Sequence, residues 1–149
     1  MPPSTTSSLF PDVNVWLAFA AERHVHHTVA VRWYDSTGPD SNIFFCRFTQ
    51  MAFLRLITNA TIMGDDVRTQ QQAWADYDGI INADDRINLI DEPRHIESIF
   101  RAVSREKVPA TSTWTDSYLI AFAEASCLSL VTFDKAMATR MPSSLLLRE

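Results

Sequence analysis

The chain has 149 residues, of which 46% are hydrophobic and 21% are charged, and its formal net charge at pH 7 is −5. Its length and composition are those of one ordinary globular domain, so we expect residues 1–149 to form a single domain whose residues 1–7 are a frayed end. The negative charge argues against a protein that coats nucleic acid non-specifically, and a content of only 3 glycines argues against a glycine-rich phosphate-binding loop.

The first third of the chain alternates short apolar runs with longer periodic segments. Leu9–Phe10 begin a short buried strand, and Val13–Ala21 and Thr28–Asp35 are predicted to be helices. The turn-forming residues TGPDSN at 37–42 then interrupt the chain. Ile43–Cys46, with the sequence IFFC, follows this turn and is predicted to be a second buried strand.

The middle of the chain is predicted to be mainly helical. Apolar residues at helical spacing indicate a helix over Thr49–Asn59, and a further helix is expected over Asp65–Ile81 with Asp65 as its N-cap. Arg86–Ile90 is a candidate strand. Residues 96–103 place four apolar side chains at positions i, i+3, i+4 and i+7, which form one face of a helix.

The last third repeats the alternation of helix and strand. We expect a helix at Thr113–Ala125, a strand at Leu128–Thr132, a short helix at Asp134–Thr139 and a last strand at Leu145–Leu147. Apolar strands joined by helices predict a parallel sheet that is covered on both faces, which is an α/β fold. Sheets of this kind bind ligands at the carboxyl ends of their strands.

Three acidic residues are expected at this edge of the sheet. Asp12 follows the first predicted strand, Asp134 follows LSLVT after one residue, and Asp116 lies in the first turn of a helix. Each has an alternative explanation, because Asp12 and Asp134 are suited to be helix N-caps and Asp116 could complete a capping box with Thr113. Together, three converging carboxylates repel one another unless a cation neutralises them, and hard oxygen ligands suit Mg²⁺ or Mn²⁺.

Four segments of the chain, in this order, resemble the motifs of PIN-domain ribonucleases: PDVNVWLA, CRFTQMAFLRLITN, TWTDSYLIAFA and LSLVTFDKAM. They look most like the VapC-type toxins of prokaryotic toxin–antitoxin pairs. The segment HVHHTVAVRWYDS after the first predicted helix is also typical of this group. The resemblance extends from about Leu9 to Met137 and so covers nearly the whole chain.

The resemblance implies a three-layer α/β/α domain with a central parallel sheet of about four or five strands. It further implies an acidic site that holds Mg²⁺ or Mn²⁺ and hydrolyses RNA, with transfer or ribosomal RNA as the expected substrate class. Asp12, Asp116 and Asp134 match the first, third and fourth acids of the family pattern. Asn14 and Thr132 match the polar residues beside the first and last acids and are expected at the substrate. The implied partners are a second copy of the chain and a cognate antitoxin.

The chain departs from the family pattern at the second acid, which is usually a Glu. Gln50 stands at that position, and its amide oxygen can ligate a metal or orient a water molecule but supplies no charge. We therefore expect Gln50 to take part in catalysis at a site that binds metal less tightly. Arg47, near the carboxyl end of its strand, is expected to hold a substrate phosphate.

Two other functions stay open from the sequence. A PIN-fold module that binds RNA or protein without useful nuclease activity is favoured by Gln50 and opposed by the three intact acids. A phosphatase with an aspartyl nucleophile would need an acid at the position of Asn14. His24, His26 and His27 indicate zinc only weakly, since His26 does not share a helical face with the other two.

The N-terminal residues lack the basic and apolar regions of a secretion signal, and no apolar run approaches the ~18 residues of a membrane span. We therefore expect a cytoplasmic protein without membrane contact. Cys46 and Cys127 lie in apolar surroundings without metal-type spacing, and we expect both to be buried, reduced thiols.

Overall fold

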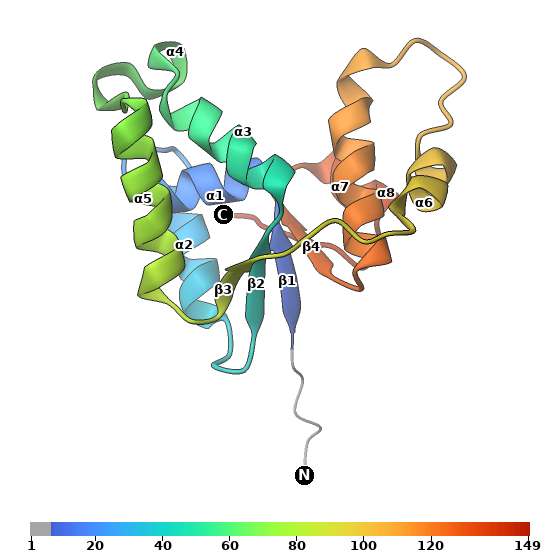
Figure 1. Cartoon of the computed structure of the whole chain (residues 1–149), viewed down its shortest axis with the longest axis horizontal. Coiled ribbons are helices and arrows are strands. Elements are labelled where there is room, and N and C mark those ends of the chain that lie inside the picture. Colours follow the sequence, from blue (N-terminus) through green and yellow to red (C-terminus); the bar gives the residue numbers. More distant parts are fainter. Residues whose placement is uncertain (1–6) are drawn as a thin grey trace.

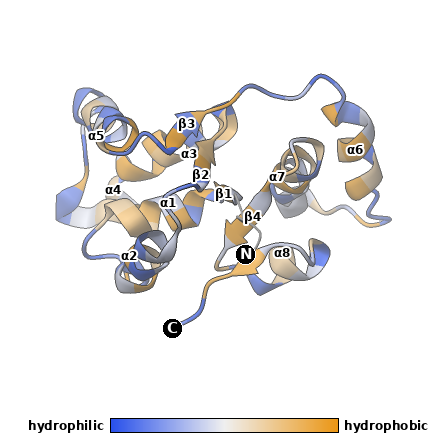
Figure 2. Ribbon diagram, turned by 90° about the horizontal axis from the view of Figure 1, so that it is seen from below, coloured by the Kyte–Doolittle hydropathy of each residue, from blue (hydrophilic) through white to orange (hydrophobic). Residues whose placement is uncertain are grey.

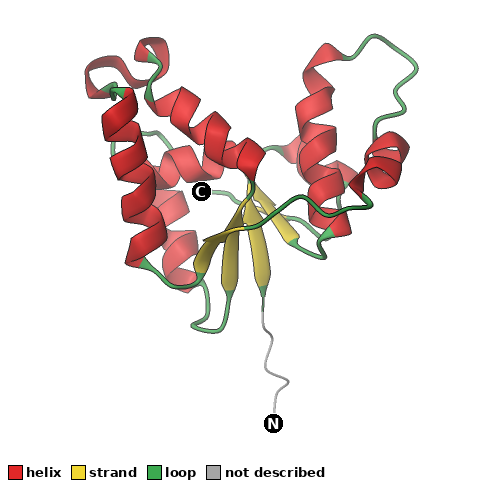
Figure 3. Ribbon diagram, viewed as in Figure 1, coloured by secondary structure: helices red, strands yellow, loops and turns green. Residues whose placement is uncertain are grey.

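The computed structural model describes residues 7–149, and five strands within that range form one parallel sheet in the order β3-β2-β1-β4-β5 (Figure 3). The strands are β1 (Ser8–Pro11), β2 (Asn42–Phe45), β3 (Ile87–Leu89), β4 (Ser129–Thr132) and β5 (Leu145–Leu146). The chain builds the sheet outward from β1 in one direction through β3 and then in the other through β5. The reversal at β1 is where open parallel sheets place their ligands.

Helices cover both faces of this sheet, which confirms the predicted three-layer α/β/α architecture. Their bounds are α1 (Val13–Ala20), α2 (His27–Ser36), α3 (Arg47–Ile57), α4 (Ala60–Met63), α5 (Gln70–Ala83), α6 (Ile96–Val103), α7 (Trp114–Ala125) and α8 (Lys135–Arg140). In Figures 1 and 2, α1, α2, α3 and α5 lie on one side of the strands, and α6, α7 and α8 lie on the other.

The core is divided by the sheet because successive strand side chains point to opposite faces. Leu9 of β1 packs with the α1–α5 side, where Trp16 stacks on Phe45 with ring centroids 3.9 Å apart. Phe10, the next residue of β1, packs with the α6–α8 side and stacks on Phe122 at 5.0 Å. Figure 2 shows the apolar strands in the middle of the three layers. A strand that is buried on both faces therefore leads directly to Asp12.

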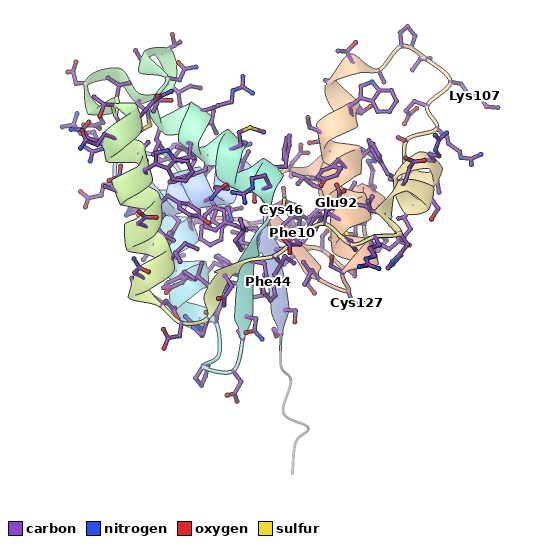
Figure 4. All side chains as sticks on the ribbon, in the orientation of Figure 1. Phe10, Phe44, Cys46, Glu92, Lys107 and Cys127 are labelled. Carbon is purple, nitrogen blue, oxygen red and sulfur yellow. The ribbon has the colours of Figure 1, made fainter. Side chains whose placement is uncertain are left out.

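Two sequence-based expectations are wrong in detail. The helix predicted from Asp65 begins at Gln70, because Asp65 lies in a 3-10 turn and Thr69 forms the capping box with Gln72. Cys127 is exposed rather than buried, and its backbone is left-handed with φ of 56°, whereas Cys46 is buried as expected. Both thiols are free, and Figure 4 labels them.

The predicted frayed end, residues 1–7, falls outside the described residues except for Ser7. The Ser7 carbonyl oxygen accepts a hydrogen bond from the backbone N–H of Asn42 at 2.8 Å, next to the β1–β2 pairing. Within residues 7–149, no helix has the length and apolar character needed to cross a membrane.

A polar network fixes the edge of the sheet at β3. The Arg86 guanidinium contacts the Asp84 carboxylate, with Nη2 and Oδ2 2.7 Å apart, and also donates to the Thr37 hydroxyl at 2.8 Å. The Tyr34 hydroxyl donates to the same carboxylate. Arg86 thereby holds the pKa of Asp84 well below its usual range, and the network joins α2 to the start of β3.

We expect Arg86→Ala to lower the free energy of unfolding by about 1–2 kcal/mol at pH 7, because it leaves Asp84 without its cation. A carboxylate with a depressed folded pKa contributes stability above its unfolded pKa and loses it as the pH falls. The difference between variant and wild type should therefore shrink below about pH 4. Urea unfolding across pH measures this, with Arg94→Ala, an exposed arginine, as the control. An Arg86→Ala difference that is constant with pH would contradict the assignment.

Candidate active site at the carboxyl ends of the strands

Asp12 is buried where β1 passes into α1. Its backbone N–H donates to the Val131 carbonyl of β4 at 2.9 Å, and its Oδ1 caps α1 by accepting from the N–H groups of Asn14 and Val15 at 3.0 and 3.2 Å. Its Oδ2 accepts a hydrogen bond from the Thr132 hydroxyl at the end of β4. The N-cap interpretation of Asp12 is therefore correct, and the cap fixes the carboxylate at the junction of two neighbouring strands.

Asp134 is joined to Asp12 through Thr132. The Asp134 N–H donates to the Thr132 hydroxyl at 3.0 Å, and that hydroxyl donates onward to Asp12. Asp134 is exposed and caps α8 through Oδ1, which accepts from Ala136 N–H at 2.8 Å. The network brings together two acids that lie more than a hundred residues apart in the chain.

Asp116 reaches the same region from the first turn of α7. Thr113, the N-cap residue, makes no side-chain hydrogen bond to the helix and donates instead to the Ala110 carbonyl at 2.9 Å. The capping-box alternative for Asp116 is therefore wrong. Arg140 of α8 lies nearby, because its Nη2 donates to the Ser117 hydroxyl at 2.6 Å and to the Val103 carbonyl at 2.9 Å.

The three acids influence one another electrostatically. Burial raises the pKa of Asp12 to about 6, with a smaller contribution from the negative charge of Asp116 and against the opposing hydrogen bonds of Thr132 and the α1 backbone. Burial and the charge of Asp134 raise the pKa of Asp116, and Arg140 lowers it. A divalent cation would remove the repulsion and favour the ionised forms.

Gln50 is buried on α3, on the opposite side of the strand ends from α7 (Figure 1). Its amide oxygen accepts a hydrogen bond from Arg47 Nη1 at 2.5 Å. Arg47 itself is exposed at the first position of α3. A neutral amide, hydrogen-bonded to the Arg47 guanidinium, thus occupies the position where the family pattern has its second acid.

The donor chemistry of these residues suits Mg²⁺ or Mn²⁺. Among residues 7–149, no three His, Cys, Asp or Glu side chains form a ready-made metal cluster. Mg²⁺ does not need one, because it is commonly bound by one or two carboxylates and keeps several water molecules. Asp116 raises the pKa of Asp12 and Asp134 raises that of Asp116, and a divalent cation would relieve this repulsion, so the site fits in charge and ligand type.

The remaining predicted site residues differ in their exposure to solvent. Asn14 is exposed on α1 beside Asp12, whereas Thr132 is fully buried and its hydroxyl is bonded on both sides. Arg140 lies near Asp116, and Tyr77 is close enough to Gln50 and Arg47 for them to lower its pKa; neither residue was predicted. Neither matches a motif in the sequence, and Arg140 is placed by the packing of the end of α8 against α7.

The histidines after α1 have structural contacts. His27 Nδ1 lies 2.8 Å from the Ala18 carbonyl oxygen, and the His26 ring stacks on Phe133 with centroids 4.7 Å apart. His24 Nδ1 accepts from the His26 N–H at 3.0 Å. These contacts hold the α1–α2 turn against the residue that precedes Asp134.

The sequence profile of the PIN domain matches residues 9–140, which contain all three acids and Gln50. The chain belongs to the PIN-domain family. Ribonuclease VapC41 of Mycobacterium tuberculosis is 42% identical over 132 residues, which span 86% of this chain and 90% of that protein. The resemblance to VapC-type PIN domains is thereby confirmed, and an aspartyl phosphatase loses its support.

Solved structures share the PIN fold. VapC20 of Mycobacterium tuberculosis, described as a sarcin–ricin-loop-cleaving toxin, superposes with a TM-score of 0.63 at 15% identity, covering 89% of this chain and 95% of the other. The VapBC2 complex of Rickettsia felis, bound to a promoter DNA fragment, gives 0.66 at 11% identity, covering 93% and 96%. At these identities the superpositions establish the fold alone.

Proposed function

We propose that the protein is a metal-dependent endoribonuclease toxin that hydrolyses RNA phosphodiester bonds. The observation that carries this proposal is the Asp12–Thr132–Asp134 network at the reversal point of the sheet, with Asp116 close enough to raise the pKa of Asp12. Membership of the PIN family and the named ribonuclease relative support it. Buried acids whose pKa values are perturbed at a ligand-binding edge are typical of catalytic sites.

Each residue has a proposed role. Asp12, Asp116 and Asp134 hold Mg²⁺ or Mn²⁺, which when bound neutralises charge and lowers the pKa of water. Thr132 positions the Asp12 carboxylate, since its hydroxyl is buried and donates to it. Arg47 holds a phosphate oxygen of the RNA.

Gln50 and Asn14 complete the proposed site. Gln50 orients Arg47 through their 2.5 Å hydrogen bond. The exposed Asn14 side chain contacts the RNA strand beside Asp12.

The proposed partners are RNA and a basic antitoxin. A hollow of about 970 Å³ lies between the end of α1 and helices α2, α3 and α5. Its apolar residues include Phe19, Phe53, Ile57, Ile80 and Ile87. Four acids and two arginines also line it: Arg23 pairs with Asp66 and Arg68 with Asp76, which leaves Glu22 and Asp65 as its excess negative charge. Apolar grooves with charged rims suit an amphipathic helix of opposite charge. We place the antitoxin helix there, and copurification with the product of the neighbouring gene tests it. A homodimer and a cytoplasmic location are part of the same proposal.

The competing function is a PIN-fold module that binds RNA or protein without cutting it, and the neutral Gln50 favours it. Cleavage of total cellular RNA by the purified, antitoxin-free protein separates the two. We expect discrete fragments, derived from transfer or ribosomal RNA, that appear with Mg²⁺ or Mn²⁺ and disappear with chelator. A folded sample that binds RNA but yields no fragments with either metal would favour the binding module.

We expect Gln50→Glu to lower the Mn²⁺ concentration needed for half-maximal cleavage by about tenfold, because it adds a carboxylate next to Arg47. Initial cleavage rates across an Mn²⁺ titration measure this. Gln71→Glu, which adds the same charge at an exposed position on α5, is the matched control. An unchanged Mn²⁺ dependence in Gln50→Glu would remove Gln50 from the proposed site.

A further inference from the structure

A second hollow, of about 510 Å³, lies between α6 and the first turn of α7, and its lining includes none of the three carboxylates. Its lining residues are Glu97, Phe100, Arg101, Ser104, Arg105 and Trp114. In Figure 1, α6 and α7 lie side by side, and the loop of residues 104–113 passes above them. The volume is within the usual range for ligand-binding pockets.

Trp114 is the unusual residue of this hollow. Its side chain is 54% exposed although it contacts Phe100, with ring centroids 6.1 Å apart and planes at 74°. An indole is amphipathic, and an exposed one held against a second ring is suited to stacking with a planar partner. Phe100 therefore fixes the indole without covering it.

The neighbourhood of Trp114 is locally basic. Residues 94–107 carry four basic and two acidic side chains, whereas the whole chain has a net charge of −5. Arg105 Nε donates to the Arg101 carbonyl at 3.2 Å, which leaves its terminal amino groups for a ligand. Arg101 pairs with Glu97 at 3.1 Å, but both side chains are more than 70% exposed, so a phosphate can replace the carboxylate at little cost.

Trp114 and Asp116 flank the same turn of α7. Two residues correspond to a rise of ~3 Å and a rotation of ~200°, so the two side chains leave the helix at nearly the same level on opposite sides. The helix is roughly 10 Å across, and a polymer that crosses its first turn can meet both. A single nucleotide is too short to contact both side chains.

We propose that the hollow between α6 and α7 is a subsite for single-stranded RNA, in which Trp114 stacks on a base and Arg101 and Arg105 hold a neighbouring phosphate. This inference rests on the proposed ribonuclease function, whose scissile phosphate lies at the carboxylates across α7. Stacking aromatics beside basic side chains are how proteins bind single strands with little sequence preference. The lining of the hollow is partly apolar, and the arginines Arg101 and Arg105 beside the indole favour a polyanion over a protein partner.

The test measures binding separately from cleavage. A fluorescently labelled, short single-stranded oligoribonucleotide is titrated with protein in chelator, and a second probe of the same length lacks all bases. Trp114→Ala is expected to weaken binding of the first probe by about tenfold and to leave binding of the second unchanged. Trp114→Phe, which keeps a ring, should recover most of the loss. Trp74→Ala is the matched control, since Trp74 is 48% exposed on α5 outside the hollow.

Three other outcomes would overturn the subsite. Equal RNA affinity in wild type and Trp114→Ala, with metal-dependent cleavage intact, would remove the subsite but keep the ribonuclease. Equal loss with both probes would show that Trp114 does not act by stacking. A Trp114→Ala protein that changes only its oligomeric state in sedimentation would assign the hollow to a contact between two copies of the chain. If the wild type neither binds nor cleaves RNA, the proposed function itself fails.

Discussion

Asp12→Asn should abolish most RNA cleavage while preserving the fold, with a rate loss on the order of 10³. Removing one carboxylate from a cation site costs several kcal/mol of charge stabilisation in the transition state, and each 1.36 kcal/mol corresponds to a factor of about ten. Asp12 is buried and caps α1, and neither neighbouring acid occupies its position: Asp134 is exposed and caps α8, and Asp116 lies on α7.

The fold should survive because Asn is as good an N-cap as Asp. The amide oxygen of Asn can accept from Asn14 and Val15 as Asp12 does now. Single-turnover cleavage in Mn²⁺ measures the loss. Asp35→Asn is the matched control, because this exposed acid at the end of α2 lies near the start of β2, at the opposite edge of the sheet. Cleavage by Asp12→Asn at more than about a tenth of the wild-type rate would exclude Asp12 from the catalytic site.

The second large effect is on stability. In chelator, the free energy of unfolding should fall by up to about 3 kcal/mol between pH 4 and pH 6 because of Asp12. Burial raises the pKa of Asp12 to about 6 from an ordinary value of 3.8, so in this interval the folded chain keeps a proton that the unfolded chain has released. The unfolded state then binds fewer protons, and stability decreases as the pH rises.

Urea unfolding of wild type and Asp12→Asn across pH isolates this contribution. The variant, which has no carboxyl group at this position, should lack the decrease and be the more stable protein at pH 7 without metal. With Mn²⁺ the wild type should become the more stable protein, because a ligand that binds only the folded state stabilises it. Parallel pH profiles for the two proteins in chelator would contradict the raised pKa of Asp12.

Much of the architecture is predictable from local sequence. Runs such as IFFC are apolar at every position because both faces of the sheet are covered, and this distinguishes a parallel sheet from an antiparallel one. The positions of Asp12 and Asp134 follow from the ends of those runs. Their convergence follows from topology, since adjacent parallel strands end at one edge. Asp116 joins them only through the packing of α7, which the sequence does not specify.

The structure differs from the sequence-based predictions where tertiary contacts or backbone geometry determine the local conformation. Asp65 looks like an N-cap, but Thr69 and Gln72 form a reciprocal pair of hydrogen bonds that starts α5 later. Cys127 adopts a left-handed turn after α7 and turns its side chain outward despite apolar neighbours in the sequence. The bond between Gln50 and Arg47 depends on rotamers, and the hollow at Trp114 depends on the spacing of α6 and α7.

In the proposed site, three carboxylates from distant parts of the chain act on one divalent cation. Titration of the protein with Mn²⁺, followed by loss of the electron paramagnetic resonance signal of the free ion, tests this without reference to any RNA. Asp12→Asn, Asp116→Asn and Asp134→Asn should each weaken Mn²⁺ binding, and Asp35→Asn should not. Wild-type Mn²⁺ affinity in all three variants, or its loss in only one of them, would show that the three acids do not form a common site.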